Sequence, residues 1–316
     1  MKRILVTGGA GYIGSHVVKA LLRMDFQVRV IDDFSTGDIR RIFPGANSIE
    51  GSILNPASLR EALEGVDLVI HLAAKKSVSE SIKEPAQYFR VNSEGTWILL
   101  SEMEKANVKA IIFSSTAAIY DSQISEKITE DFHVKPKTPY GVSKLMGEKL
   151  IESFCDVYDF NAVILRYFNV VGAGDSHLGE TSGESLLPSV FSAISKSKNP
   201  QIFGNDYNTF DGTCVRDFIH VSDIAESHLA VMEYLKNNRG FSVFNVGTGV
   251  GYSVKQVIDQ VIKNLGISPK IDLLPRRIGD VPFSVADSKK LFSATGWKPV
   301  FGLAEMVDSG WLASSK

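Results

Sequence analysis

The first 32 residues constrain the fold more than any other stretch of the chain. Residues 4–6 (ILV) are a short apolar run that breaks into residues 7–14 (TGGAGYIG), and apolar residues then recur at helical spacing up to Met24. A second apolar run ends in Asp32. Glycines at such a turn let the backbone approach a pyrophosphate, whose charge meets the free N–H groups of the following helix. The pattern predicts a dinucleotide site in which Asp32 binds the adenosine ribose.

The two acids that follow the second strand indicate which dinucleotide binds. Asp32 and Asp33 would repel the 2′-phosphate of NADP, so NAD is the favoured cofactor. Asp33 is better interpreted as a solvated turn residue than as a cofactor contact.

Later strands place this site in a larger sheet. Residues 67–72 and 110–114 are continuous apolar runs, typical of central parallel strands that are covered on both faces. Helical regions at 85–106 and 139–158 alternate with such runs, which predicts an α/β fold with a doubly wound parallel (Rossmann) sheet. Binding residues should collect at the carboxyl ends of the strands. The candidates there are Ala73, Ala74, Lys76, Ser114, Ser115 and Thr116.

A tyrosine and a lysine are predicted to lie one helical turn apart beside these strand ends. Thr138 is a suitable N-cap and Pro139 suits the first helical position, so Tyr140 and Lys144 share one helix face. A nearby ammonium favours the phenolate and lowers the pKa of the tyrosine towards the range of a general base. Thr116 has a hydroxyl that can bond a substrate oxygen beside Tyr140, although a strand-end threonine can also simply cap a turn.

Composition excludes several classes of function. The chain has 316 residues, 44% of them hydrophobic, and a formal net charge of -2, which gives no electrostatic footprint for nucleic acid or an anionic membrane. No apolar run approaches the roughly 18 to 20 residues of a membrane span. Its two cysteines and six histidines show no metal-ligand spacing, so we expect no metal. The start of the chain lacks the apolar region of a signal peptide, and we expect a cytoplasmic protein.

Several of these motifs carry a family resemblance. Residues 7–14, the strand end 114–116 and the pair Tyr140 and Lys144 resemble the extended short-chain dehydrogenase/reductase family. Within it, the chain resembles the UDP-glucose 4-epimerase (UDP-galactose 4-epimerase) family over nearly its whole length, in the stretches 71–76, 166–173, 203–207, 211–221 and 275–280. The resemblance implies reversible epimerisation at C4 of a UDP-hexose, by transient hydride transfer to tightly bound NAD through a 4-keto sugar.

The resemblance also implies roles for individual residues. Tyr140 would take the proton of the sugar 4-hydroxyl, Thr116 would bond the same oxygen, and Lys144 would hold the nicotinamide ribose and lower the Tyr140 pKa. The implied cofactor contacts are Gly8, Gly11, Tyr12, Ile13, Gly14, Asp32, Ala73, Lys76, Asn92, Ser114, Tyr140, Lys144 and Tyr167.

The implied contacts to the UDP-sugar lie mostly in the second half of the chain. They are Thr116, Asn169, Ser185, Leu186, Arg216, Arg277, Asp280 and Ser284. Arg216 and Arg277 would bind the diphosphate and Asp280 the uridine ribose. Taken singly, each arginine is more often a solvated or ion-paired surface residue, and the family's motifs favour phosphate binding.

The same resemblance divides the chain and suggests how it assembles. Residues 1–170 would bind NAD, with 215–248 returning to that domain, and residues 171–214 and 249–316 would form a smaller, discontinuous α/β region for the UDP-sugar. The helices 85–106 and 139–158 would pack as the four-helix interface of a homodimer.

Four positions depart from the family pattern or vary within it. Ser52 replaces an acid that touches the adenine, Asp121 replaces a glycine for no reason we can give, and Ser185 replaces an asparagine or histidine that meets the substrate. Ser284 falls where residues of varying bulk gate the sugar pocket. Its small side chain leaves room for a 2-acetamido group, which gives the hypothesis that UDP-N-acetylglucosamine is also a substrate.

Two alternatives remain at this point. A related nucleotide-sugar enzyme would need acid-base residues after the threonine for 4,6-dehydration, or a glutamate in this region for decarboxylation, where this chain has Ala117 and Ala118. A non-catalytic NAD-sensing protein would have no need of Thr116, Tyr140 and Lys144 together.

Overall fold

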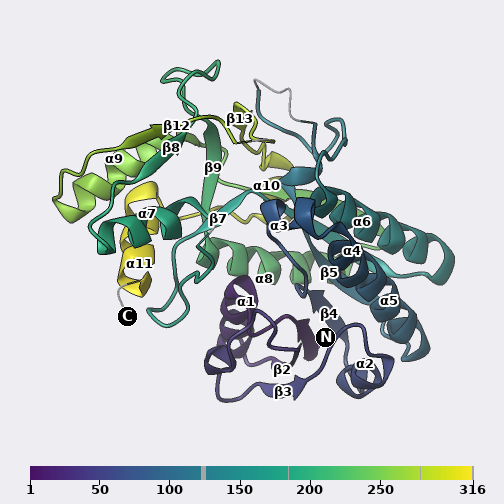
Figure 1. Ribbon diagram of the computed structural model, residues 1–316. Helices are drawn as coiled ribbons and strands as arrows, with labels where there is room; N and C mark the ends of the chain where they lie inside the picture. Colours follow the sequence, from purple (N-terminus) through teal and green to yellow (C-terminus); the bar gives the residue numbers. More distant parts are fainter. Residues whose placement is uncertain (122–125, 184, 278, 315–316) are drawn as a thin grey trace.

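A parallel sheet forms the centre of the larger part of the molecule. The computed structural model describes residues 1–121, 126–183, 185–277 and 279–314. Within these residues, seven parallel strands lie in the order β10-β6-β5-β4-β1-β2-β3 (Figure 1). The strand order reverses between β1 and β4, which is where a doubly wound sheet binds its ligand. The strands are β1 (Arg3–Thr7), β2 (Gln27–Asp32), β3 (Asn47–Glu50), β4 (Leu68–His71), β5 (Ala110–Thr116), β6 (Asn161–Tyr167) and β10 (Phe241–Val246).

Helices bury both faces of this sheet. On one face α1 (Tyr12–Arg23), α8 (Val221–Asn237) and α10 (Lys289–Thr295) enclose a core that includes Val6, Leu165 and Val246. On the other face α2 (Pro56–Leu63), α5 (Gly95–Lys105) and α6 (Pro139–Tyr158) enclose Leu5 and Ile164. Side chains of successive strand residues point to opposite faces, and both sets are buried here, which explains the continuous apolar runs in the sequence.

The helix α6 matches its sequence signals at both ends. Thr138 is the N-cap, and its hydroxyl accepts a hydrogen bond from the Gly141 N–H at 3.2 Å, with Pro139 in the first turn. The helix ends at Asp159, which adopts the left-handed conformation with φ of 59°. The capping residues therefore fix the start of the helix that carries Tyr140 and Lys144.

The predicted helix at 85–106 is present but is not uniform. It consists of α4 (Pro85–Tyr88), a π-helical segment (Phe89–Glu94) and α5, preceded by the short helix α3 (Val78–Lys83). Asn92 lies in the π-helical segment, where its side chain contacts Lys75 and Ser143. Single π turns inside helices commonly occur at functional sites.

A smaller α/β region packs beside the large sheet, on the left in Figure 1. Its central strand β9 (Val215–His220) pairs with β7 (Asn169–Val171), β11 (Gly251–Ser253) and β13 (Phe283–Ser284), and β8 (Gln201–Phe203) pairs with β12 (Asp272–Leu274). Three helices, α7 (Leu186–Ser195), α9 (Val254–Leu265) and α11 (Leu303–Ser314), close a separate apolar core.

Two segments differ from the predicted division of the chain. Strand β9, at the start of 215–248, pairs in the smaller sheet, so that α8 and β10 alone return from this segment to the large sheet. In the opposite direction, α10 lies in the predicted UDP-sugar region, yet Leu291 and Trp297 pack in the core under α8. The chain thus crosses between the two regions more often than predicted. In the described part of the chain, no helix has the length and apolar character needed to traverse a bilayer.

Candidate active site

The glycine turn between β1 and α1 is too tight for larger side chains. Gly8 has a φ of +72°, and a Cβ at this position would lie 2.7 Å from the Ala73 nitrogen. A Cβ at Gly14 would lie 2.1 Å from the Gly8 oxygen. Gly11 is the N-cap of α1 and provides no side-chain acceptor for the first N–H groups of the helix. These groups are available to an anion, as the predicted pyrophosphate site requires.

Asp32 is held at the end of β2 by the backbone of two turns. Its carboxylate accepts hydrogen bonds from the Ala10 N–H and the Phe34 N–H, each at 2.9 Å. Burial raises its pKa, although these two bonds oppose the shift. A Cβ at Gly37 would approach Asp32 Oδ1 to 2.7 Å, so this glycine also belongs to the cradle, and the sequence analysis missed it.

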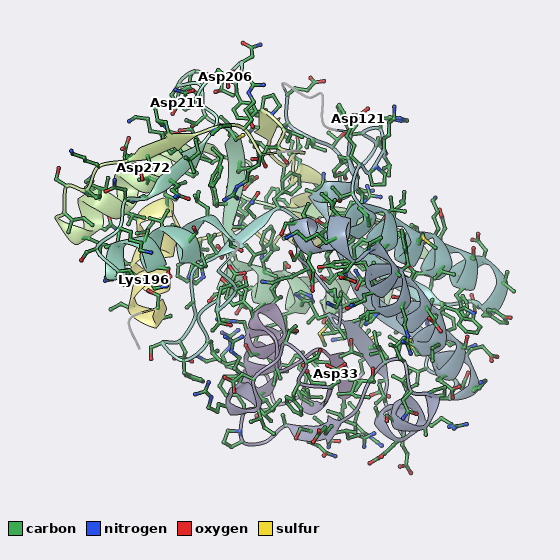
Figure 2. The ribbon with its side chains drawn as sticks, viewed as in Figure 1. Asp33, Asp121, Lys196, Asp206, Asp211 and Asp272 are labelled. Carbon is green, nitrogen blue, oxygen red and sulfur yellow. The ribbon has the colours of Figure 1, made fainter. Side chains whose placement is uncertain are left out.

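Asp33 has the role of a turn residue in this structure. It is exposed, and its carboxylate accepts from the Ser35 N–H at 3.0 Å and the Ser35 hydroxyl at 2.6 Å (Figure 2). Asp121, the unexplained departure, has its carboxylate 3.6 Å from the Lys137 ammonium.

A chain of buried hydrogen bonds leads from β1 towards α6. The Thr7 hydroxyl lies 2.7 Å from His71 Nδ1, and His71 Nε2 lies 3.0 Å from the Thr96 hydroxyl, which donates to the Asn92 carbonyl oxygen. Burial lowers the pKa of His71 to about 3, so the ring is neutral. Thr96 already donates, and it must therefore accept from His71 Nε2–H, which leaves Nδ1 to accept from Thr7.

The side-chain amide of Asn92 is fully engaged. Its oxygen accepts from the Lys75 N–H at 2.8 Å, and its nitrogen donates to the Lys75 oxygen at 3.0 Å and to the Ser143 hydroxyl at 2.9 Å. These bonds join the segment that carries Lys76 to the helix that carries Tyr140. The predicted contact of Asn92 with the cofactor stays a prediction.

Thr116, Tyr140 and Lys144 come together where β5 ends and α6 begins. The Thr116 side chain lies close enough to the Tyr140 hydroxyl to lower the pKa of that phenol. Lys144 Nζ donates to the Ser114 carbonyl oxygen at 2.7 Å and lies 4.9 Å from the centroid of the Phe113 ring. The structure therefore assembles all three predicted catalytic side chains at one strand end.

The pKa values of this pair differ from the prediction. The sequence predicts that Lys144 lowers the pKa of Tyr140, but burial raises it, with the Thr116 hydrogen bond acting in the opposite direction. Burial lowers the pKa of Lys144 to about 7, and Glu148 opposes this shift. For both side chains the cost of burying the charged form is larger than the stabilisation by neighbouring groups, because both lie in the protein interior rather than on a solvated helix.

The lowered pKa of Lys144 predicts a pH dependence of stability. An unfolded lysine titrates near about pH 10.4, so between about pH 7 and pH 10 the unfolded chain binds more protons than the folded one. The free energy of unfolding should therefore rise with pH in this range, and Lys144→Met should remove that part of the rise. Urea unfolding of both proteins at pH 7 and pH 9.5 measures the difference. An equal rise in wild type and variant would contradict the shifted pKa.

Tyr167 lies beside this group and is fixed from behind. Its hydroxyl contacts His228 Nε2 at 2.8 Å and the Ser114 side chain, and burial raises its pKa. His228 Nδ1 lies 2.9 Å from the Ile224 oxygen, so Nδ1 donates there and Nε2 accepts from Tyr167. The sequence analysis missed His228, because a lone histidine on a helix gives no sign of a partner in a distant strand.

Two of the predicted phosphate and ribose contacts, Arg216 and Asp280, lie near one another. Arg216 Nη2 is 3.7 Å from Asp280 Oδ1, and Arg216 Nη1 donates to the Val281 oxygen at 2.6 Å. Ser284 of β13 is paired with Arg216 of β9. The guanidinium of Arg277 lies 3.7 Å from the centroid of the Phe203 ring. Ile278, in the same motif as Arg277, lies outside the described residues.

A loop from the smaller region crosses to the glycine turn. The Tyr12 hydroxyl donates to the Gly172 oxygen at 2.6 Å. Glu180 is ion-paired with Lys76 and accepts from the Ser185 hydroxyl at 2.9 Å. A predicted cofactor contact and a predicted substrate contact thus share one carboxylate that the sequence analysis missed. Leu186, the next predicted contact, packs against the core of the smaller region, and Asn169 is exposed at the start of β7.

A surface hollow and the grouping of possible metal ligands also bear on where the site lies. A surface hollow of about 520 Å³ at the end of α7 is lined by residues that include Lys196 and Asp272, and none of the predicted site residues lines it (Figure 2). Within the described ranges, His, Cys, Asp and Glu form no group of three that could hold a metal ion.

The reversing parallel sheet, the glycine cradle with Asp32 and the Thr-Tyr-Lys group at the strand ends define a dinucleotide-dependent enzyme of the Rossmann type. Residues 4–247 match the NAD dependent epimerase/dehydratase family, and the chain belongs to this family. The predicted fold class and the cofactor NAD are thereby confirmed.

Similar proteins cover almost the whole chain. The UDP-glucose 4-epimerase of Halalkalibacterium halodurans is 40% identical over an alignment of 315 residues, which covers 98% of this chain and 94% of that protein. The solved UDP-glucose-4-epimerase of Stenotrophomonas maltophila, with bound NAD, has a TM-score of 0.95 at 33% identity, covering 100% of this chain and 98% of the other. The UDP-Glc/GlcNAc 4-epimerase of Campylobacter jejuni has a TM-score of 0.87 at 37% identity, covering 100% and 99%.

Proposed function

We propose that the protein interconverts UDP-glucose and UDP-galactose by epimerisation at C4, through a transient 4-keto sugar. The observation that carries the proposal is the Tyr140 hydroxyl beside Thr116 and one helical turn from Lys144, in a family that is NAD-dependent. Near-full-length identity of 40% to a UDP-glucose 4-epimerase supports the same reaction.

The residues of the cradle fit NAD. At Gly8, Gly14 and Gly37 a Cβ would overlap backbone atoms or Asp32, so only glycine allows this tight turn, and Asp32 supplies a carboxylate at the end of β2. Bound NAD would supply a reversible acceptor for the hydride at C4 of the sugar. Asp32 would hold the adenosine ribose, the start of α1 would hold the pyrophosphate, and Lys144 would hold the nicotinamide ribose.

The chain itself would move the proton and orient the sugar. Tyr140 accepts the proton of the 4-hydroxyl as C4 is oxidised and returns it when C4 is reduced from the other face. Thr116 bonds the same oxygen and keeps it at the tyrosine. The raised pKa of Tyr140 in this structure means that its phenolate needs positive charge nearby, which Lys144 provides when protonated.

The smaller region would bind the UDP part of the substrate. Arg216 and Arg277 would neutralise the diphosphate, and Asp280, whose carboxylate lies 3.7 Å from the Arg216 guanidinium, would accept hydrogen bonds from the ribose hydroxyls. We propose this division of labour between the large sheet and the smaller region, with Asn169, Ser185 and Leu186 at the boundary.

The segment after Thr116 favours epimerisation over dehydration. Ala117 to Ile119 form a single 3-10 turn, and the Ala118 N–H donates to the Thr116 hydroxyl oxygen at 3.1 Å. Neither Ala117 nor Ala118 has a side chain that can protonate or deprotonate a sugar. The acid-base pair required for 4,6-dehydration is therefore missing at this position.

We propose that the enzyme also converts UDP-N-acetylglucosamine, because the side chain of Ser284 beside Arg216 is small. The enzyme should be incubated with each sugar separately, without added NAD, and the anomeric proton signals should be followed by NMR. We expect the C4 epimer to form in both cases. Ser284→Tyr should lower turnover of the N-acetyl sugar by at least about tenfold through overpacking, and should spare UDP-glucose. Brisk turnover of UDP-glucose by wild type with none of the N-acetyl sugar would reject this extension.

We propose a homodimer that forms through α5 and α6. Trp97, Met146 and Val157 on these two helices are 52%, 44% and 71% exposed, an apolar surface that a partner helix pair would cover. Sedimentation should give twice the chain mass for wild type and the single mass for Trp97→Arg. A monomeric wild type would contradict the proposal.

The free cysteines Cys155 and Cys214 fit a reducing cytoplasmic location.

A further inference from the structure

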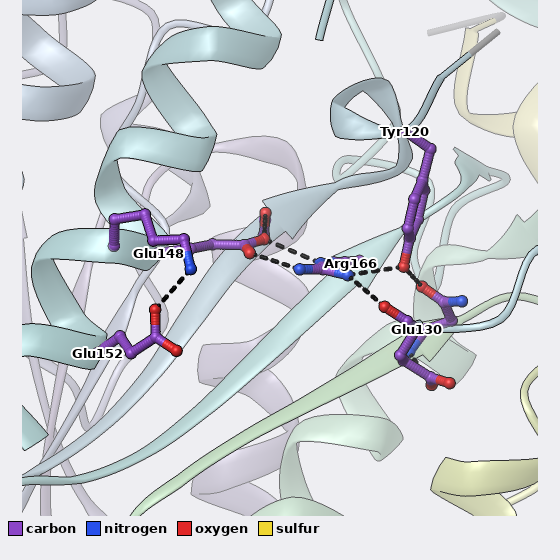
Figure 3. A network of polar contacts seen from close by, with 8 residues as sticks. Tyr120, Glu130, Glu148, Glu152 and Arg166 are labelled. Carbon is purple, nitrogen blue, oxygen red and sulfur yellow. Dashed lines mark hydrogen bonds and ion pairs between the residues drawn. The ribbon is translucent and has the colours of Figure 1, made fainter. Parts of the chain in front are cut away.

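A buried carboxylate joins three structural elements behind the proposed active site (Figure 3). Glu148 of α6 accepts two hydrogen bonds from Arg166 of β6, from Nε at 3.0 Å and from Nη2 at 2.7 Å. The Ser115 hydroxyl of β5 donates to the same carboxylate. These residues are only 3%, 6% and 2% exposed for Glu148, Arg166 and Ser115. The proposed reaction uses none of them.

The two strand residues in this group are each next to an active-site residue. Ser115 is paired with Arg166 in the register of β5 and β6, and Thr116 is paired with Tyr167. Successive strand side chains point to opposite faces, so Ser115 and Arg166 face α6 while Thr116 and Tyr167 face the other side. The bonds that Glu148 makes to Ser115 and Arg166 therefore also hold the backbone that carries Thr116 and Tyr167.

The helix residue in this group has the same relation to Lys144. Glu148 is one helical turn beyond Lys144 on α6, and Lys144 Nζ reaches back to the Ser114 oxygen at the end of β5. Its carboxylate also favours the charged form of Lys144, which burial disfavours. Among the residues that the structure describes, His71 of β4, which is neutral, also interacts with Lys144.

The far side of Arg166 is held as firmly as the side that meets Glu148. Its Nη1 donates to the Tyr120 hydroxyl at 2.9 Å and to the Glu130 carbonyl oxygen at 3.2 Å (Figure 3). The Tyr120 hydroxyl in turn donates to Asn245 Oδ1 at 2.7 Å. The guanidinium is planar and bonded along both edges, so it cannot rotate without breaking several buried bonds.

We infer that Glu148 is a positioning residue of the reaction. Through Ser115 and Arg166 it sets the placement of the ends of β5 and β6 relative to the first turns of α6. Stability alone is a poor explanation for such a pair, because replacing a buried ion pair with apolar residues of similar volume is often neutral or stabilising. The inference rests on the proposed function and deepens it, since it assigns the geometry of the Thr116, Tyr140 and Lys144 group to residues that touch neither sugar nor cofactor.

The test removes the whole ion pair rather than one partner. Glu148→Leu alone would leave the Arg166 charge buried and unpaired, whereas Glu148→Leu with Arg166→Met removes both charges at similar volume. We expect the double variant to melt near the wild-type temperature, to retain NAD and to keep the KM for UDP-glucose. Its kcat should fall by about 10²-fold, the cost of a displacement of about 1 Å among reacting groups.

Two further variants separate positioning from folding. Ser115→Ala removes a single hydroxyl from the carboxylate and should lower kcat by about tenfold without a change in melting temperature. Glu152→Gln is the matched control, because Glu152 lies one turn further along α6 and pairs at the surface with Lys149 at 2.7 Å. It should leave kcat unchanged. If the double variant does not fold, a normal kcat for Ser115→Ala overturns the inference.

A crystal structure of the double variant gives a readout that does not depend on turnover. The hydrogen bond from Lys144 Nζ to the Ser114 oxygen, 2.7 Å in the wild-type chain, should be broken. A normal kcat together with this bond intact would show that Glu148 and Arg166 are an ordinary buried ion pair. If the wild type converts no UDP-sugar, the proposed function fails, and the crystal structure alone then decides the role of Glu148 by the same criterion.

Discussion

Replacing Tyr140 with phenylalanine is expected to lower kcat by about 10²- to 10⁴-fold, because the 4-hydroxyl then has no base to take its proton. The ring should keep its place, since it packs edge-on against Tyr88 with centroids 6.4 Å apart and needs no hydroxyl for that contact. NAD content and the KM for UDP-glucose should stay near wild type. The measurement is steady-state turnover of UDP-glucose at saturating substrate, with bound NAD determined after denaturation.

The control for this variant is Tyr88→Phe. Tyr88 lies against the same ring, but its hydroxyl donates to Glu80 at 2.7 Å and has no role in the proposed reaction. We expect that variant to turn over within a few fold of wild type. Near-normal activity of Tyr140→Phe would mean that another group takes the proton and that the catalytic assignment is wrong.

Replacing Gly14 with alanine is expected to abolish stable retention of NAD. The new Cβ would lie 2.1 Å from the Gly8 oxygen and 2.9 Å from the Gly9 Cα, and these are backbone atoms of the turn itself. The turn must open, and overpacking of this kind costs about 1–3 kcal/mol, which weakens NAD binding by about 5- to 160-fold if the cost falls on the bound state. The ratio of absorbance at 260 nm and 280 nm after gel filtration reports the bound cofactor.

Gly302→Ala serves as the matched control. Its Cβ would meet Glu305 Oε2 at 3.5 Å, an ordinary contact, at the start of a helix in the smaller region. This variant should keep its NAD. Full NAD content in Gly14→Ala would show that the cofactor does not depend on this turn, and would contradict the assignment of the cradle.

The features that could be predicted from the sequence are those fixed by local chemistry. The turn at residues 7–14 is recognisable because its glycines stand at fixed spacing between an apolar strand and a helix, and the contact of Gly14 with Gly8 lies within the turn itself. The helix predicted at 139–158 agrees with α6, because Thr138 and Pro139 signal its start. The Thr116, Tyr140 and Lys144 group could be anticipated because parallel strands end at one edge of the sheet.

The features that could not be predicted depend on contacts between distant parts of the chain. Strand β9 was not predicted, and its neighbours β7, β11 and β13 come from three separate segments. The π-helical segment around Asn92 is associated with bonds to Lys75 and Ser143, which periodicity does not reveal. The helix α11 at Leu303–Ser314 was missed altogether.

The same reason explains the missed polar residues of the site. Glu148 and Arg166 are 18 residues apart, and Tyr120 and Asn245 are 125 apart, so neither pair has a sequence signature. The pKa of Tyr140 was predicted in the wrong direction because the degree of burial was unknown. Desolvation can change a pKa by several units, and a helical spacing contains no information about it.

The most direct test of the proposed reaction follows the hydrogen at C4 of the sugar. UDP-glucose that carries deuterium at C4 should be incubated with the enzyme in ordinary water without added NAD, and the product analysed by NMR and mass spectrometry. If the hydride passes to bound NAD and returns, UDP-galactose will form with the deuterium still at C4. Formation of UDP-galactose with ordinary hydrogen at C4 would mean exchange with water, and would contradict the transient oxidation on which the account rests.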